Sequence, residues 1–112
     1  MFLPYRVIIT SRGNEKKGIY FSDADYDKFK YNMDQARGIY AFLLHCYVLM
    51  INQYHLVVET PSANLNSIMH YINSSHSNYV NRKMKRSGHL LQGRYRAILV
   101  DQDNHPLELS AI

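Results

Sequence analysis

The sequence has a single cysteine, Cys46, so no disulfide can form within the chain. Cys46 lies in the apolar run 39–50, where we expect it to be a small buried residue in a reducing, cytoplasmic setting. This longest apolar run, of about a dozen residues, is too short to cross a bilayer. The N-terminus lacks the charged segment and the long apolar segment of a signal peptide. With 46% hydrophobic residues in a chain of 112, we expect one folded domain over 1–112.

Acidic residues are absent from a long stretch of the second half, between Glu59 and Asp101. The basic residues of this stretch are Arg82, Lys83, Lys85, Arg86, Arg94 and Arg96, together with the histidines His70, His76 and His89. The net charge of +4 is therefore concentrated on one part of the chain. A polyanion, and nucleic acid in particular, is the natural partner of such a surface. The alternative is a face that is only solvated.

The first half of the chain predicts a strand, a helix and a second strand. The β-rich segment 5–10 is a short strand. Ser22 is a predicted helix N-cap, with Asp25 as the second member of a capping box, and apolar residues at helical spacing follow until Gly38 ends the helix. The almost continuously apolar run 39–50 predicts a central strand covered on at least one face.

The second half predicts a hairpin, a helix and a last strand. A tight turn around Asn52 returns the chain as a strand over 54–60, and Leu65 begins an apolar helical stripe that the Ser-Gly pair 87–88 stops. The last strand covers about 94–100. The order β-α-β-β-α-β predicts a ferredoxin-like α+β plait, an antiparallel sheet with both helices on one face and the other face free to bind a ligand. Many unrelated proteins share this fold, so it does not decide function.

Gln53 and His55 are two residues apart on a predicted strand, so their side chains point to the same face. Two histidines at this spacing hold a divalent ion that polarises a DNA phosphate. Glutamine offers only a neutral amide oxygen, a poorer ligand than imidazole for Mn²⁺ or Zn²⁺. We therefore expect a weak or lost metal site and no tightly bound cofactor. The alternative is a pair of ordinary surface polar residues.

Four segments resemble one family when they are taken in order. They are Thr10-Ser11-Arg12-Gly13, the helix opening 21–29, the hairpin 48–61, and 79–100, with its string Ser87-Gly88-His89-Leu90-Leu91-Gln92-Gly93-Arg94-Tyr95. In this order and spacing, the chain resembles the single-tyrosine HUH transposases, especially the REP-associated, IS200-like type. The resemblance covers about residues 5–101.

The resemblance implies a particular chemistry. In this family a divalent ion, held by two histidines and a third polar ligand, polarises the scissile phosphate of single-stranded DNA, and a tyrosine attacks to form a 5′-phosphotyrosine. Family members recognise imperfect hairpins with a short flanking single strand. The resemblance therefore implies DNA, single-stranded or hairpin, as the partner, Mg²⁺ or Mn²⁺ as the ion if activity remains, and a homodimer as one option for assembly.

The sequence departs from the family pattern at two places. Gln53 stands where the first metal histidine is expected and Ile51 where a proline is usual, so only His55 matches. The nucleophilic tyrosine of the family follows the last strand, whereas no tyrosine follows Asp101 here. Among the ten tyrosines of the chain, Tyr79 is the fallback nucleophile, although its place on the apolar helical stripe favours core packing.

Polar and basic residues after the first strand and around the end of the second helix are predicted DNA contacts. They are Arg12, Arg82, Lys83, Lys85, Arg86, His89, Gln92, Arg94 and Arg96. Tyr95 alternates with its arginine neighbours and is a candidate for stacking a base, on the opposite face of the strand.

The sequence favours a DNA-binding module that keeps the transposase fold and has lost the cutting machinery. The alternative is an active, metal-dependent, single-strand nicking and joining transposase with an unusual metal site. A third interpretation, an RNA-binding ferredoxin-like domain, is weak because the chain lacks the Lys/Arg-Gly-Phe/Tyr-type string of RNA-recognition modules.

Overall fold

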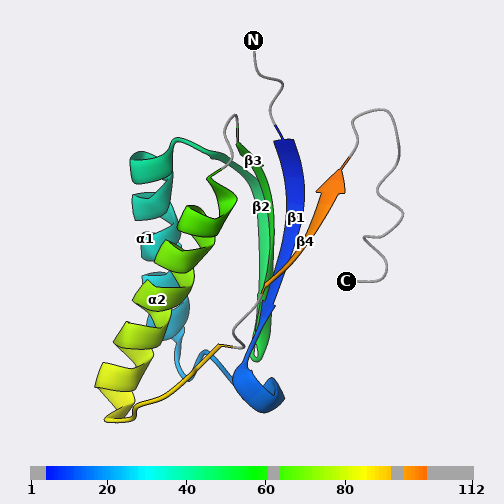
Figure 1. The fold of residues 1–112 in the computed structure, drawn as a ribbon. Helices are drawn as coiled ribbons and strands as arrows, with labels where there is room; N and C mark the ends of the chain where they lie inside the picture. The colour runs from blue at the N-terminus through cyan, green and yellow to red at the C-terminus, as the bar shows by residue number, and fades with distance from the viewer. Residues whose placement is uncertain (1–4, 61–63, 92–94, 101–112) are drawn as a thin grey trace.

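Two long helices lie beside one sheet in the computed structural model, which describes residues 5–60, 64–91 and 95–100 (Figure 1). In chain order the elements are β1 (Tyr5–Arg12), the short 3-10 helix η1 (Asn14–Lys16), α1 (Asp23–Tyr40), β2 (Leu43–Met50), β3 (Gln53–Thr60), α2 (Leu65–Met84) and β4 (Arg96–Val100). Neither long helix of this described part has the apolar length that a membrane crossing requires.

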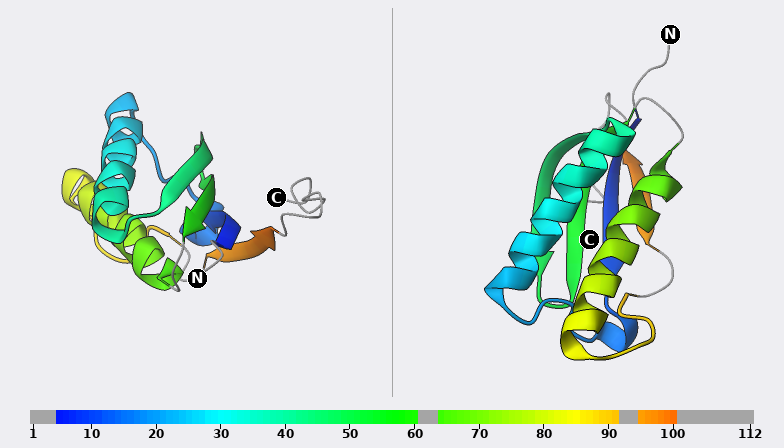
Figure 2. Two further views of the ribbon diagram at one scale, coloured as in Figure 1. Left: turned by 90° about the horizontal axis from the view of Figure 1, so that it is seen from above. Right: turned by 90° about the vertical axis from the view of Figure 1, so that its left-hand side faces the viewer.

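The four strands form one antiparallel sheet in the order β2-β3-β1-β4. The central strand β1 pairs along its whole length with β3, and over residues 6–10 with β4. Both helices lie on the same face of this sheet, and the other face carries no helix of the described chain (Figure 2). The predicted ferredoxin-like plait is therefore confirmed.

Alternating side chains on the central strands build the core between the sheet and the helices. On β3, Tyr54, Leu56 and Val58 are almost fully buried, whereas the residues between them are partly exposed. Other core residues, from β1 and from both helices, are Val7, Ile9, Phe29, Met33, Ile68 and Ile72. Each aliphatic or aromatic side chain buried in this way contributes about 1.5–3 kcal/mol. The sheet thus has one apolar face toward the helices and one open face.

The predicted placement of the 39–50 run is wrong. β2 begins only at Leu43, and it lies at the edge of the sheet with β3 as its one neighbouring strand in the described structure. The central positions are taken by β3 and β1. Most β2 side chains are exposed, including Cys46, which was predicted to be buried. Within β2, Leu44 and Leu49 pack against the core. A continuous apolar run predicts a strand, but it does not reveal how many neighbouring elements cover that strand.

Both helices end at a left-handed residue that is not glycine. α1 continues through Gly38, its predicted end, to Tyr40, and Ala41 then adopts φ 53°. α2 ends before the predicted stop at 87–88, and Lys85 there also has φ 53°. A backbone hydrogen bond to the preceding turn closes each end and helps to offset the strain of about 1–2 kcal/mol for a left-handed residue with a Cβ.

The predicted capping box at the start of α1 forms only in part. Asp25 Oδ2 accepts a 2.7 Å hydrogen bond from the Phe21 N–H, but Ser22 makes no side-chain cap. Instead, Ser22 Oγ accepts a 2.8 Å hydrogen bond from Lys83 Nζ. Because Lys83 lies near the end of α2, this contact joins the start of one helix to the end of the other.

Candidate functional site

The open face of the sheet carries Gln53 and His55 side by side on β3. Both are partly exposed, and they alternate with the buried residues of β3 that face the helices. The prediction that the two side chains share a face is therefore confirmed. They therefore project on the side of the sheet that no described helix covers (Figure 2).

His55 is held in place by its neighbour on β1. Thr10 pairs with His55 in the sheet, and Thr10 Oγ1 lies 2.9 Å from His55 Nδ1. Burial lowers the pKa of His55 below its ordinary value, which favours the neutral ring. None of the described residues forms a hydrogen bond with its other nitrogen, Nε2. Metal-binding histidines are commonly oriented in this way, with one nitrogen hydrogen-bonded and the other available to the ligand.

Gln53 is held more weakly than His55. Its Nε2 donates to Met50 Sδ at 3.4 Å, and a thioether is a weak acceptor. The pair therefore offers one imidazole nitrogen and one amide oxygen. Among the described residues there is no group of three or more His, Cys, Asp or Glu side chains that would hold a metal ion. Because an amide oxygen is a poorer ligand than imidazole for Mn²⁺ or Zn²⁺, this donor set fits such an ion less well than two histidines would.

Two of the predicted DNA contacts share the open face with this pair, both on the side of β1 and β4. Arg12 pairs with Gln53 across the β1–β3 ladder, and Arg96 pairs with Thr10, which itself pairs with His55. Directly opposed residues of antiparallel strands share a face, with Cβ atoms about 4.5–5.5 Å apart. Neither arginine forms an ion pair with a described residue. We call Arg12, Gln53, His55 and Arg96 the open-face patch.

The remaining described cations of the prediction lie around the end of α2. These exposed residues are Arg82, Lys83, Lys85 and Arg86, followed by His89. The Arg86 guanidinium lies 5.7 Å from the centre of the Phe21 ring. A 2.9 Å hydrogen bond from the Asn14 N–H to the Leu90 carbonyl connects the segment after α2 to the segment after β1. The cations of α2 and the open-face patch thus lie toward the same end of the molecule (Figure 1).

Lys83 differs from the other cations of this region because its charge is already paired. Lys83 Nζ lies 2.6 Å from Oδ1 of Asp25, which is fully buried. Tyr79 O–H donates to the same oxygen at 3.0 Å. Burial alone would raise the pKa of Asp25, but the hydrogen bonds from Lys83, the Phe21 amide and Tyr79 outweigh burial and lower the pKa. The ammonium group of Lys83 is therefore engaged in an ion pair within the fold, and a DNA phosphate would have to compete with Asp25 for it.

Neither Tyr79 nor Tyr95 brings its hydroxyl to His55. Tyr79 packs in the helical layer, and the sheet separates it from the open face. Burial, together with Asp25, raises the pKa of Tyr79, which makes the phenol a poorer nucleophile. Tyr95 packs against the core, and its O–H donates to Asn66 of α2. This geometry gives no support to Tyr79 as the fallback nucleophile or to Tyr95 as a freely exposed stacking platform.

Two predicted contacts, Gln92 and Arg94, and the tail 101–112 lie outside the described residues.

Among the described residues, a cluster of charged side chains surrounds Glu59, and the sequence did not predict it. Glu59 Oε1 accepts from Arg6 Nη2 at 3.2 Å and lies 2.8 Å from His45 Nε2. These bonds, that of His45 first, lower the pKa of Glu59. Because Glu59 neutralises Arg6, the unpaired positive charge of the open face lies toward the end with Arg12.

The family of this fold follows from comparison with known proteins. A family model described as "Transposase IS200 like" matches residues 3–109. The chain belongs to the IS200-like transposase family. The resemblance inferred from the four sequence segments is thereby confirmed. A comparison with curated proteins finds no match.

Two solved structures share the fold of this IS200-like domain. One is the REP-associated tyrosine transposase bound to a REP hairpin, with a TM-score of 0.73 and 10% identity, over 91% of this chain and 60% of that chain. The other is a proposed transposase from Deinococcus radiodurans R1, with a TM-score of 0.68 and 14% identity, over 99% of this chain and 85% of that chain. The domain thus spans 60% of the length of the hairpin-bound structure. At these identities the likeness shows the fold alone.

Proposed function

We propose that this IS200-like transposase domain binds single-stranded or hairpin DNA at its cationic end and does not cut it. The observation that carries the proposal is the open-face patch, in which Arg12 on β1 and Arg96 on β4 share one face of the sheet with Gln53 and His55. Arginine side chains bind phosphate oxygens, while a glutamine and a neutral histidine donate or accept hydrogen bonds without repelling a polyanion.

The charges of the domain support DNA as the partner. No acidic residue occurs between Glu59 and Asp101, and the exposed cations Arg82, Lys85 and Arg86 lie toward the same end as the open-face patch. The structurally similar REP-associated transposase is bound to a REP hairpin. A DNA hairpin is therefore the first ligand to test.

The absence of cutting is proposed from the donor set of β3. His55 Nε2 is the strongest metal donor of the open-face patch, and Gln53 adds only an amide oxygen. One imidazole and one amide do not hold an ion firmly enough to position a phosphate for attack. Neither Tyr79 nor Tyr95 presents a hydroxyl beside His55.

An active nicking and joining transposase is the second candidate. It is favoured by one observation, the way Thr10 orients His55 so that Nε2 stays available on the open face. In that case Gln53 would serve as a metal ligand together with groups from outside the described residues.

Fluorescence anisotropy with a labelled DNA hairpin, measured between roughly 50 and 200 mM salt, tests the binding. Each phosphate contact contributes about −0.7 on a single strand and about −0.9 on a duplex to the log–log slope of affinity against salt, so Arg12→Ala with Arg96→Ala should flatten the slope by about 1.4 to 1.8. The matched control is Lys28→Ala with Lys30→Ala, which removes two cations of α1 that, like Arg12 and Arg96, form no ion pair with a described residue. Equal slopes for the two double variants would exclude the open-face patch as the DNA surface.

A further inference from the structure

The strand β2 presents an unpaired edge. Within the described part of the chain it pairs only with β3, so the backbone N–H and C=O groups of its outer side have no strand partner there. Folded proteins commonly protect such an edge with lysine, proline or a β-bulge. β2 has an irregularity between Leu44 and Cys46, but the segment 46–50 that follows contains neither proline nor a charged residue. This segment is therefore open to pairing with another strand.

One face of β2 carries exposed apolar side chains. This face is turned away from the helices, because its residues pair with the partly exposed residues of β3. They are Leu43, Cys46, Val48 and Met50, and all four are exposed. The side chains of Val48 and Met50 are 53% and 42% exposed, although valine and methionine are usually buried. Apolar side chains that gather on a surface in this way mark an interaction site.

The other face of β2 borders a cavity of about 320 Å³ that lies between β2 and α1. Tyr47 supplies part of its apolar lining, and Lys30 and Arg37 of α1 bring positive charge to it. Asp34 pairs with Arg37 at 3.1 Å. Lys30 is exposed and forms no ion pair with a described residue, so its charge is available to a partner. The two faces of β2 therefore differ, one apolar and one beside a cation.

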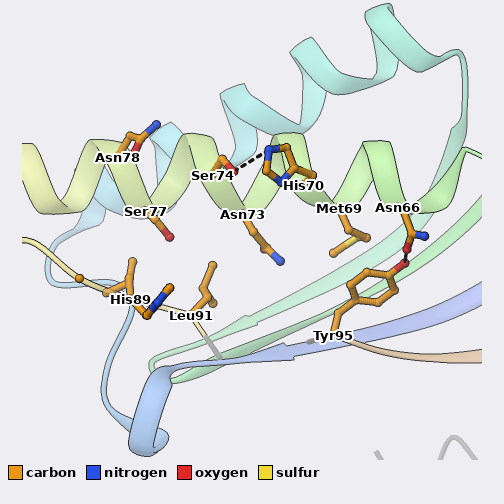
Figure 3. Close-up of a pocket in the computed structure, with 12 residues that line it drawn as sticks. Asn66, Met69, His70, Asn73, Ser74, Ser77, Asn78, His89, Leu91 and Tyr95 are labelled. Carbon is orange, nitrogen blue, oxygen red and sulfur yellow. Dashed lines mark hydrogen bonds between the residues drawn. The ribbon is translucent and has the colours of Figure 1, made fainter. Parts of the chain in front are cut away.

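This edge is separate from the larger groove of the described chain. That groove, of about 550 Å³, lies along α2, and Figure 3 shows His89 toward one end of it and Tyr95 toward the other. No residue lines both the groove and the cavity beside β2. The β2 edge is thus a second surface, on the α1 side of the molecule.

We propose that the segment 46–50 of β2 binds an extended peptide segment of another protein, in which apolar and acidic residues alternate. When a peptide adds as a strand to a sheet edge, main-chain hydrogen bonds give affinity and alternate side chains give specificity. Successive side chains of a strand point to opposite faces. The apolar side chains of the peptide then lie beside Val48 and Met50, and its carboxylates lie on the side of Lys30. Such binding does not require the proposed DNA binding.

A second copy of the domain fits this edge less well than an acidic strand does. Two β2 strands paired about a two-fold axis would bring the same side of α1 from each copy together. That side carries two cations, Lys30 and Arg37, and one anion, Asp34, so both copies would present a net positive charge. Like charges that face each other oppose association. A strand with carboxylates supplies the opposite charge.

Three fluorescein-labelled peptides of equal length, about seven residues, test the pairing by fluorescence anisotropy. The first alternates valine and glutamate. The second has the same sequence with every backbone nitrogen methylated, so it keeps the side chains and loses the N–H donors. The third has lysine in place of glutamate. Cys46 is exposed and is the single cysteine of the chain, so its rate of alkylation reports whether the edge is covered.

We expect the domain to bind the valine–glutamate peptide at least about ten-fold more tightly than its methylated form, because two or more hydrogen bonds to β2 are lost. This peptide should also slow the alkylation of Cys46. Lys30→Glu should weaken its binding by about two- to five-fold, the range for an exposed charge pair, and should strengthen binding of the lysine peptide. The matched control is Lys28→Glu, a change on α1 outside the cavity, which should behave as the parent does.

Equal affinities for the valine–glutamate peptide and its methylated form would overturn the proposal, as would an alkylation rate of Cys46 that the peptide leaves unchanged. Equal effects of Lys30→Glu and Lys28→Glu would overturn the assignment of an acidic partner. Sedimentation of the domain alone tests the competing occupant. A dimer that binds none of the three peptides would assign the edge to a second copy and overturn the proposal.

Discussion

Lys83 Nζ lies 2.6 Å from Asp25 Oδ1, and this ion pair fastens the end of α2 to the start of α1. Asp25 is fully buried, whereas the lysine side chain is 37% exposed. A buried carboxylate that loses its cation is costly, because the charge remains in a surrounding of low polarity. One lysine of the basic segment 82–86 is therefore committed to the fold, although in the sequence it looks like its basic neighbours.

Replacing Lys83 and Arg82 one at a time with alanine should distinguish a residue that stabilises the fold from a residue that binds DNA. We expect Lys83→Ala to lower the thermal unfolding midpoint, because it leaves the buried carboxylate of Asp25 without its cationic partner. Arg82 is exposed and has no ion pair among the described residues, so Arg82→Ala should leave the midpoint unchanged and flatten the salt slope of DNA binding by about 0.7. Calorimetry and anisotropy on the same samples provide the check. Unchanged midpoints in both variants would show that the Lys83–Asp25 pair does not hold the helices together.

Acid should destabilise the domain in part through Asp25. The folded pKa of Asp25 is lowered, whereas an unfolded aspartate titrates near about 3.9. As the pH falls below the unfolded value, unfolded chains bind the proton first, so stability present above about pH 4 is lost as the pH approaches the folded pKa. Asp25→Asn should be less stable at pH 7 by on the order of 1–3 kcal/mol and should lose less stability in acid.

Urea unfolding at a series of pH values from about 7 down to 2 measures this difference. The other carboxylates titrate in both proteins, so the gap between the two curves isolates Asp25. If the parent and Asp25→Asn lose stability in parallel, the Lys83 and Tyr79 contacts do not lower the pKa of Asp25.

Local patterns predicted the parts of the site that depend on one strand. The i, i+2 spacing of Gln53 and His55 sufficed to place them on one face, because alternation is a property of a single strand. The order of elements also predicted the plait. Arg12 and Arg96 are far apart in the sequence, and only the position of β1 between β3 and β4 brings both of them to the same face as that pair.

Features that depend on contacts between distant segments of the chain were not predicted from the sequence. Cys46 belongs to an apolar run, but its exposure follows from the edge position of β2, which is set by strand order. Lys83 looked like one more DNA contact because its partner, Asp25, is 58 residues away. The Thr10–His55 hydrogen bond likewise requires the register of β1 against β3. Contacts of this kind do not change the local sequence pattern around either residue, so that pattern cannot predict them.

Replacing Gln53 by histidine should improve metal binding. The parent should bind Mn²⁺ weakly, whereas Gln53→His places a second imidazole beside His55 Nε2 on the same face. Isothermal calorimetry measures the affinity. In the Gln53→His background, His55→Ala should abolish the gain, and Thr10→Val should weaken binding by about 10- to 100-fold because it removes the partner that orients the ring. Tight binding by the unaltered domain that disappears in His55→Ala would show that Gln53 is an adequate ligand.

Incubation of the domain with Mn²⁺ and a hairpin substrate should produce no covalent protein–DNA adduct. Attack on a phosphate requires a phenol close to a firmly held ion. Tyr79 O–H is committed to Asp25 at 3.0 Å in the helical layer, and Tyr95 O–H is committed to Asn66. A denaturing gel detects an adduct as a slow-migrating, protease-sensitive band.

The Gln53→His variant tests this last prediction more severely, because it adds the second metal-binding histidine without adding a tyrosine as nucleophile. If the missing histidine were the only defect, Gln53→His would form the adduct. We expect it to bind Mn²⁺ more tightly and still form none, since neither Tyr79 nor Tyr95 lies beside His55 on the open face. A band from either protein would contradict this, and Tyr79→Phe followed by Tyr95→Phe would then identify the nucleophile. A band that survives both substitutions would locate the nucleophile at another residue.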